Sequence, residues 1–266
     1  ITVGCKLLFA NIASLLVTGI VRWGIQINWD VVTYAKISFT LSVSNLFLAF
    51  ISAVAVVLYP TLRRTNEERL PYIYGSLRNM LMMPILACLI LYYPIMMILS
   101  KWLPQYTDGI RYMAILFPLC IYSAKMNMLV QTYLKVFRLE KHILRINIIG
   151  LILAAFSTAV CVFLLNNLTV SMISIVVNQM ICCIYAEIIL SKHINIRVLK
   201  DIIFEIILTA VFIISSWFIG GWFGVGIYTI VYVAYVVCKI PEVKKLIEIS
   251  RSFIENRRIN QEGGYL

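Results

Sequence analysis

The sequence predicts an all-α integral membrane protein, a polytopic bundle of about eight transmembrane helices. Hydrophobic residues make up 62% of the 266-residue chain, and its mean hydropathy is +0.92, whereas soluble domains contain about 45–50% apolar residues. The apolar residues fall into long blocks, and about 20 helical residues, rising ~1.5 Å each, cross a hydrocarbon core of ~30 Å. Membrane barrels instead show short alternating runs, which this sequence lacks.

The predicted spans follow from the apolar blocks and from the polar stretches that separate them. Two of the connections, Asn166-Asn167 and Gly220-Gly221, are short turn sequences that join antiparallel helices. The eight blocks are 5–23, 36–59, 80–99, 111–133, 143–165, 168–190, 202–219 and 222–240.

The basic residues lie mainly on one side of the predicted membrane. The loops after the second, fourth and sixth spans, the C-terminal tail and Lys6 hold 18 of the 23 lysines and arginines, and the opposite side holds 4. Basic loops face the cytoplasm in most membrane proteins, so these loops and the tail are predicted to be cytoplasmic. The net charge of +11 thus serves orientation, and no nucleic-acid motif accompanies it in the sequence.

The two ends of the chain carry further expectations. Residues 241–255 alternate apolar and basic residues at helical spacing, which favours an amphipathic helix on an anionic inner leaflet. Residues 256–266 are polar and predicted to be disordered. The chain begins at Ile1 and enters a span almost at once, so we expect it to have lost an N-terminal half.

Short motifs around the first spans and in one cytoplasmic turn resemble a transporter superfamily. Val21-Arg22-Trp23-Gly24-Ile25 ends the first span, Tyr34-Ala35 enters the second, and Tyr59-Pro60-Thr61-Leu62-Arg63-Arg64 leaves it. Tyr133-Leu134-Lys135, followed by Glu140-Lys141 and Asn147, occupies a later turn. These segments resemble the multidrug/oligosaccharidyl-lipid/polysaccharide superfamily, and among its members the Wzx-like flippases. An acidic residue often precedes the arginine in that family, and Val21 departs from this.

The resemblance implies a MATE-like fold of two six-helix lobes around a central cavity. Residues 1–190 would form the second lobe, 191–240 two additional spans and 241–266 a cytoplasmic tail. The implied function is a flippase that moves undecaprenyl-diphosphate-linked oligosaccharide across the bacterial cytoplasmic membrane by alternating access. Its partners would be that substrate, membrane lipids and the missing N-terminal lobe, with no cofactor, metal or nucleic acid.

Lys125 is the sharpest candidate for a substrate contact. It lies well inside the fourth predicted span, where a charged side chain costs about 2.5–3.5 kcal/mol on insertion scales. A cation in the central cavity could meet the lipid-linked diphosphate. The alternative is a lysine that reaches the membrane surface or forms a structural ion pair.

Other polar residues within or beside the spans are weaker candidates. Arg22 and Lys36 lie at the outer membrane edge, where they could contact phosphate or sugar or could anchor the helices beside Trp23. Glu187 and Glu205 could couple transport to an ion, but pairing with Lys192, Arg197 or Lys200 is the favoured interpretation. Amides within spans could bind sugar hydroxyls or bond between helices; they are Asn45, Asn127, Gln131, Asn178 and Gln179.

The prolines, one glycine and the cysteines predict helix shape and packing rather than chemistry. Pro84 and Pro94 within the third span predict a kink that could be a hinge or a static bend. Gly150 predicts close helix packing. The seven cysteines show no zinc or redox spacing and are expected to be buried thiols.

Two other functions remain open at this stage. A multidrug exporter of the same fold would use cavity acids for cationic drugs, whereas this chain offers cations. An integral-membrane enzyme of polysaccharide assembly would need a cluster of catalytic groups. The sequence contains no phosphate-binding loop, H-E-x-x-H or nucleophile elbow, so we expect no enzymatic activity.

The charge count makes a prediction about topology. Single cysteines at Asp108 and Asn167 should react with a membrane-impermeant maleimide added to intact cells, because the basic residues place those turns outside. Cysteines at Asn66 and Arg197 should react only after the cells are opened. External labelling at Asn66 would reverse the orientation.

Overall fold

The structure is a computed structural model, and it describes residues 2–63 and 70–240, except for the side chains of several residues in the first two helices. The described residues are helical throughout, without strands. The helices are α1 (Thr2–Asn28), α2 (Val31–Arg63), α3 (Leu70–Ala87), η2 (Cys88–Leu91), α4 (Tyr92–Trp102), η3 (Pro104–Tyr106), α5 (Thr107–Leu116), α6 (Leu119–Lys125), η4 (Met126–Val130), α7 (Gln131–Val136), α8 (Glu140–Thr158), η5 (Ala159–Leu164), α9 (Leu168–Ile194), α10 (Leu199–Ile214), η6 (Ser215–Ile219) and a last helix, Gly221–Ile240.

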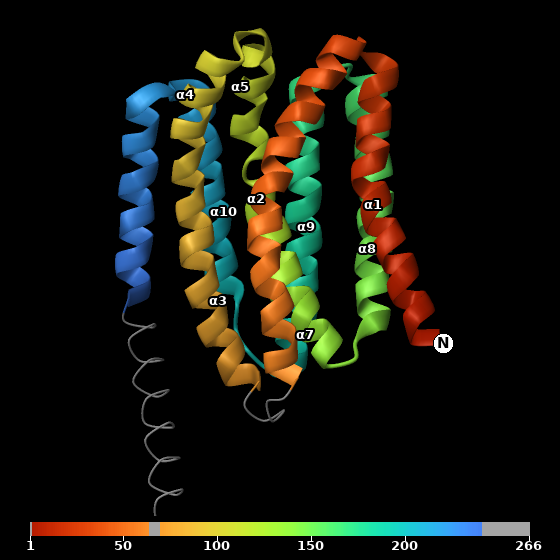
Figure 1. Cartoon of the computed structure of the whole chain (residues 1–266). Coiled ribbons are helices and arrows are strands. Elements are labelled where there is room, and N and C mark those ends of the chain that lie inside the picture. Colours follow the sequence, from red (N-terminus) through yellow and green to blue (C-terminus); the bar gives the residue numbers. More distant parts are fainter. Residues whose placement is uncertain (1, 64–69, 241–266) are drawn as a thin grey trace, which may run out of the picture.

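These helices stand side by side along one common direction, with successive spans antiparallel (Figure 1). One end of the bundle carries the turns α1–α2, α4–α5 and η5–α9, and the other end carries α7–α8 and α9–α10. This alternation agrees with the sides assigned from the basic residues. The protein is thus a polytopic helical bundle.

Six predicted spans coincide with helices suited to crossing a membrane. Five are long and apolar enough among the fully described residues, and a sixth is a pair, Pro104–Leu116 and Leu119–Val136, bent by 45°. The five are Leu70–Trp102, Glu140–Leu164, Leu168–Ile194, Leu199–Ile219 and Gly221–Ile240. Helices α1 and α2, of 27 and 33 residues, coincide with the first two predicted spans but include side chains outside the described set. The total of eight therefore stays a prediction.

The structure corrects two residues assigned to cytoplasmic loops and tail. The third span begins at Leu70 and not near Met80, so that Arg78 lies inside α3 and is 2% exposed. Lys239 lies in the last helix and is 4% exposed. The count of basic residues placed both outside because a lone charge is costly in a membrane; here both are paired. Without these two, the positive side still holds 16 basic residues against 4.

Prolines break two of the spans. In the third span a 3-10 turn, η2, separates α3 with Pro84 from α4 with Pro94. Proline has no N–H and cannot continue the helical hydrogen-bond ladder, so the predicted interruption has a direct cause. Pro118 lies at the 45° bend between α5 and α6.

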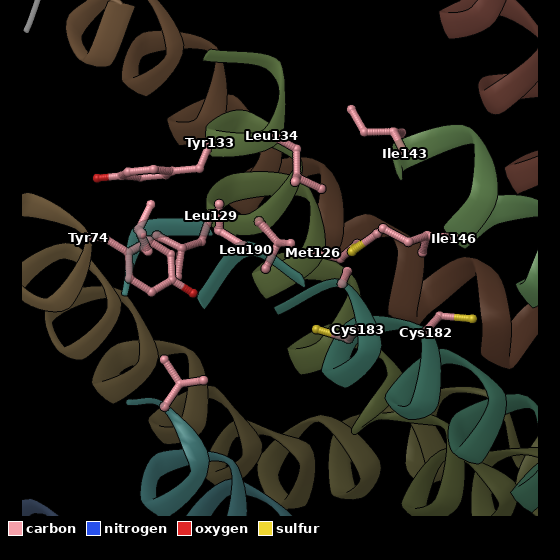
Figure 2. Packing of buried hydrophobic residues seen from close by; sticks show 14 of the residues in the cluster. Tyr74, Met126, Leu129, Tyr133, Leu134, Ile143, Ile146, Cys182, Cys183 and Leu190 are labelled. Carbon is pink, nitrogen blue, oxygen red and sulfur yellow. The ribbon is translucent and has the colours of Figure 1, made fainter. Parts of the chain in front are cut away.

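A hydrophobic cluster fills the end of the bundle near α7 (Figure 2). Tyr74 and Tyr133 meet edge to face with their ring centroids 5.0 Å apart, within the range of ~4.5–7 Å typical of aromatic pairs. Gly150 lies so close to α9 that an added Cβ would be 2.8 Å from Cys182 Sγ, which confirms the predicted close packing. Cys120, Cys161, Cys182 and Cys183 are buried as expected, whereas Cys238 is exposed.

The amphipathic tail predicted for 241–266 lies outside the described residues. The division into a lobe and two additional spans likewise stays a prediction. What the structure adds is that α10 and the last helix pack directly against the third span. The hydroxyls of Tyr228 and Tyr232 donate to the carbonyls of Leu86 and Met83, at 2.9 and 3.0 Å, beside its proline break.

Candidate functional site

A buried cluster of charged side chains joins five helices. Arg78 of α3 lies at its centre: Nε contacts Glu187 Oε1 at 2.6 Å, Nη2 contacts Glu205 Oε1 at 2.7 Å, and Nη1 lies 3.2 Å from Asp201 Oδ2. The guanidinium thus spreads its charge over three carboxylates from α9 and α10. Its planar fork suits this geometry, which a lysine could not reproduce.

Lys125 completes the cluster from the end of α6. Its ammonium pairs with Glu187 and also lies 2.5 Å from Glu205 Oε2. Each glutamate therefore accepts from the arginine with one oxygen and from the lysine with the other. The Tyr74 hydroxyl donates a further hydrogen bond to Glu187 Oε1 at 3.2 Å.

The last helix contributes the third cation. Lys239 pairs with Asp201, which also faces Arg78. The cluster therefore contains three cations and three anions and is neutral as a whole. We call these six residues the charge cluster: Arg78, Lys125, Glu187, Asp201, Glu205 and Lys239.

The charge cluster gives Lys125 two carboxylate partners. The side chain is 1% exposed and engaged by both, as in the ion pair weighed as the alternative, and its contact with substrate stays a prediction. In this state its ammonium cannot meet a diphosphate directly. The expected pairing of Glu187 and Glu205 with Lys192, Arg197 or Lys200 is wrong, because both acids face the bundle interior instead.

A sequence signal for the cluster does exist. Arg78, Glu187 and Glu205 lie respectively eight, seven and six residues from the ends of their helices on the same side of the bundle, and Lys125 eleven residues before Val136. At ~1.5 Å per residue these depths fall within roughly 9–17 Å of that end. Similar depth and opposite sign could therefore have suggested the pairing.

A separate cavity of about 300 Å³ lies among α1, α2, α6, η4, α7, α8 and α9. Its described lining carries five amide side chains and one hydroxyl, and no charged group. The polar residues are Asn45, Ser123, Asn127, Gln131, Asn147 and Gln179. Three of the predicted substrate-binding residues, Asn45, Asn127 and Gln131, are thus brought together here. We call this space the amide cavity.

Most of the cavity amides are free to bind a ligand. The side chains of Asn45, Asn127, Gln131 and Gln179 make no hydrogen bond within the described part of the chain. Asn178, by contrast, donates to the carbonyl of Gly150 at 3.3 Å, so it has the structural role weighed for these amides. Two other cavity residues lie outside the predicted substrate site. Gln179 was one of the amide candidates within spans, and Asn147 was noted only as part of a motif.

A π-helical turn shapes one wall of the amide cavity. Segment η4 follows Lys125 directly and carries Asn127, and Gln131 comes next. Single π turns inside α-helices occur frequently at functional sites. The same stretch of helix thereby presents Lys125 to the charge cluster and Asn127 to the cavity.

The remaining two predicted site residues lie near the opposite end of the bundle. Lys36 pairs with Asp108 at 3.0 Å, and the side chains are 24% and 86% exposed. Arg22 is half-buried, and its Nε has no hydrogen-bond partner among the described residues. Neither residue lines the amide cavity.

The turn between α1 and α2 ends with an acid. Asp30 accepts a hydrogen bond from the Thr33 hydroxyl, which lowers the pKa of its carboxyl group. Asp30 is therefore ionised at neutral pH, at the start of α2. Such a charge interacts favourably with a helix N-terminus.

Comparison with known proteins gives no relative. No family model matches the chain, and no curated protein and no solved structure matches it. The likeness to Wzx-like flippases therefore rests on the sequence motifs, and function must be argued from the site.

The charge cluster makes a prediction about stability. Lys125→Met should lower the free energy of unfolding by about 3–5 kcal/mol, because it leaves two buried carboxylates against one arginine. Lys36→Met is the matched control and should cost less than about 1 kcal/mol, since its pair with Asp108 is exposed. Denaturant unfolding in detergent micelles, followed by circular dichroism, measures both. Equal losses would contradict the cluster.

Proposed function

We propose that this chain is part of a membrane transporter that flips undecaprenyl-diphosphate-linked oligosaccharide across the bacterial cytoplasmic membrane. The amide cavity is the observation that carries the proposal. Polar side chains without partners are costly inside a membrane bundle, and they persist there mainly where they line a path for a polar molecule. An oligosaccharide headgroup is such a molecule.

Alternating access would move the headgroup between leaflets while the lipid stays in the bilayer. Helices α1, α2 and α8, which wall the cavity, contain no member of the charge cluster. They could therefore move against the helices that the cluster holds. The break at Pro84 and Pro94 and the bend at Pro118 are further places where a span could flex.

The diphosphate would need a cation that Lys125 cannot supply while it is paired. Arg22 is the remaining candidate, because its Nε is buried without a hydrogen-bond partner among the described residues. It lies five residues along α1 from Val17, a cavity residue. Sugar in the cavity and diphosphate nearer the outer end would fit this arrangement.

Two alternatives receive less support. A multidrug exporter for cationic drugs would need a free acid facing its cavity, and Glu187 and Glu205 are both neutralised by cations on the other side of α9. An enzyme of polysaccharide assembly would need clustered catalytic groups in a pocket. The described lining of the amide cavity holds amides and one serine hydroxyl, which are weak acids and bases.

The test is transport in the source cell. Asn127→Leu and Gln131→Leu, each introduced at the chromosomal locus, should reduce surface polysaccharide and cause lipid-linked oligosaccharide to accumulate inside. Both variants should keep normal amounts of protein in the membrane, since the amides make no bond within the described part of the fold. Gln105→Leu, which changes an exposed amide in η3, is the control and should export normally. Normal export by both cavity variants would contradict the proposed function.

A further inference from the structure

We infer that the amide cavity binds the uncharged sugar part of the substrate and excludes the diphosphate. This inference rests on the proposed function and says which portion of the cargo this chain recognises. It differs from the expectation of a cationic cavity that attracts the diphosphate by its positive charge. The argument has three parts: charge, hydrogen-bonding capacity and size.

Charge is the first part. No lysine or arginine belongs to the described lining of the cavity. Two cations adjoin lining residues along the chain. Arg145 precedes Ile146 but is exposed. Lys125 precedes Met126 and turns to the opposite face of its helix, where two carboxylates hold it. A diphosphate moved into this space would lose its hydration without gaining a counter-charge, which is strongly unfavourable.

Hydrogen-bonding capacity is the second part. A primary amide offers two donors and an accepting oxygen, and a sugar hydroxyl likewise both donates and accepts. Phosphate oxygens only accept and would leave the amide oxygens without partners. Asn127, Gln131 and Gln179 come from two neighbouring helices, so they can meet hydroxyl groups on different edges of one ring.

Size is the third part. The cavity of about 300 Å³ is at the small end of the roughly 300–1,000 Å³ that ligand pockets occupy. It suits about one or two sugar rings rather than a whole repeat unit. Met126 and Ile146 add apolar surface to the wall, against which the C–H face of a sugar ring can pack.

Cysteine protection tests the inference directly. Ser123, which lines the cavity and is half-buried, is replaced by cysteine in the otherwise cysteine-free chain, reconstituted in lipid nanodiscs. The rate of reaction with a small methanethiosulfonate reagent is measured with N-acetylchitotetraose, maltotetraose or sodium pyrophosphate at equal ionic strength. A chain that retains only Cys238, which is exposed on the last helix, reports non-specific effects.

At least one oligosaccharide should slow labelling at Ser123→Cys, by about twofold when its concentration equals the dissociation constant. Pyrophosphate should leave the rate unchanged, and Cys238 should respond to neither. Adding Asn127→Leu should abolish the protection, whereas Asn127→Asp should retain part of it because a carboxylate still accepts from hydroxyl groups. Slowing by pyrophosphate, or no slowing by either sugar, would overturn the inference.

The outcome is separable from that of the transport test. Sugar protection together with normal export by Asn127→Leu would leave a sugar site in a protein that does not use it for export. Protection by pyrophosphate together with lost export would support the transport function and contradict the inference that the cavity binds sugar and excludes diphosphate.

Discussion

Charge balance inside the bundle is the constraint on which this structure depends. Each ionised side chain taken from water into a membrane protein carries a desolvation cost of several kcal/mol, and mutual attraction offsets it only in good geometry. Arg78 and Lys125 meet Glu187 and Glu205 at both oxygens of each carboxylate, and Asp201 with Lys239 closes the arrangement. Because no member can be removed without leaving another uncompensated, the helices that carry them are fixed in register.

This constraint divides the bundle into two functional regions. The third span, the helix ending at Lys125, α9, α10 and the last helix are tied by the cluster and by tyrosine hydroxyls on neighbouring carbonyls. On the far side of two of these helices, the one that carries Lys125 and α9, lies the amide cavity, walled also by α1, α2 and α8. A rigid, neutral support next to an adaptable polar cavity is an arrangement that alternating access could use.

Hydropathy predicted the spans well because bilayer insertion depends on local composition. The six spans that the structure describes fully lie where the apolar blocks placed them. Gly150 lies at a close helix contact, and a 3-10 turn interrupts the span between Pro84 and Pro94, both as predicted. The start of the third span was wrong because Arg78 ended the apolar block. A sliding window sees the charge of an arginine but not the acid that faces it from a helix more than 100 residues away.

The same lack of information about facing helices explains which site residues the sequence could not assign. Sequence gives the depth of Lys125 in the membrane, but the direction of its side chain depends on how α6, η4 and α9 turn about their axes. Asn45, Asn127 and Gln131 were predicted as cavity residues and do share one cavity, because amides within spans are rare enough to be selected on polarity alone. Asn178, chosen on the same ground, bonds instead to the Gly150 carbonyl, and only the packing distinguishes it.

The most direct test of the central claim is a comparison of Lys125→Met alone with Lys125→Met combined with Glu205→Gln. The double variant removes one cation and one anion, so the remaining cluster is again neutral. The account predicts that unfolding in detergent micelles shows the double variant to be more stable than Lys125→Met, with a coupling free energy well above the ~0.5 kcal/mol expected of independent sites. Losses that simply add would contradict charge balance as the basis of the fold.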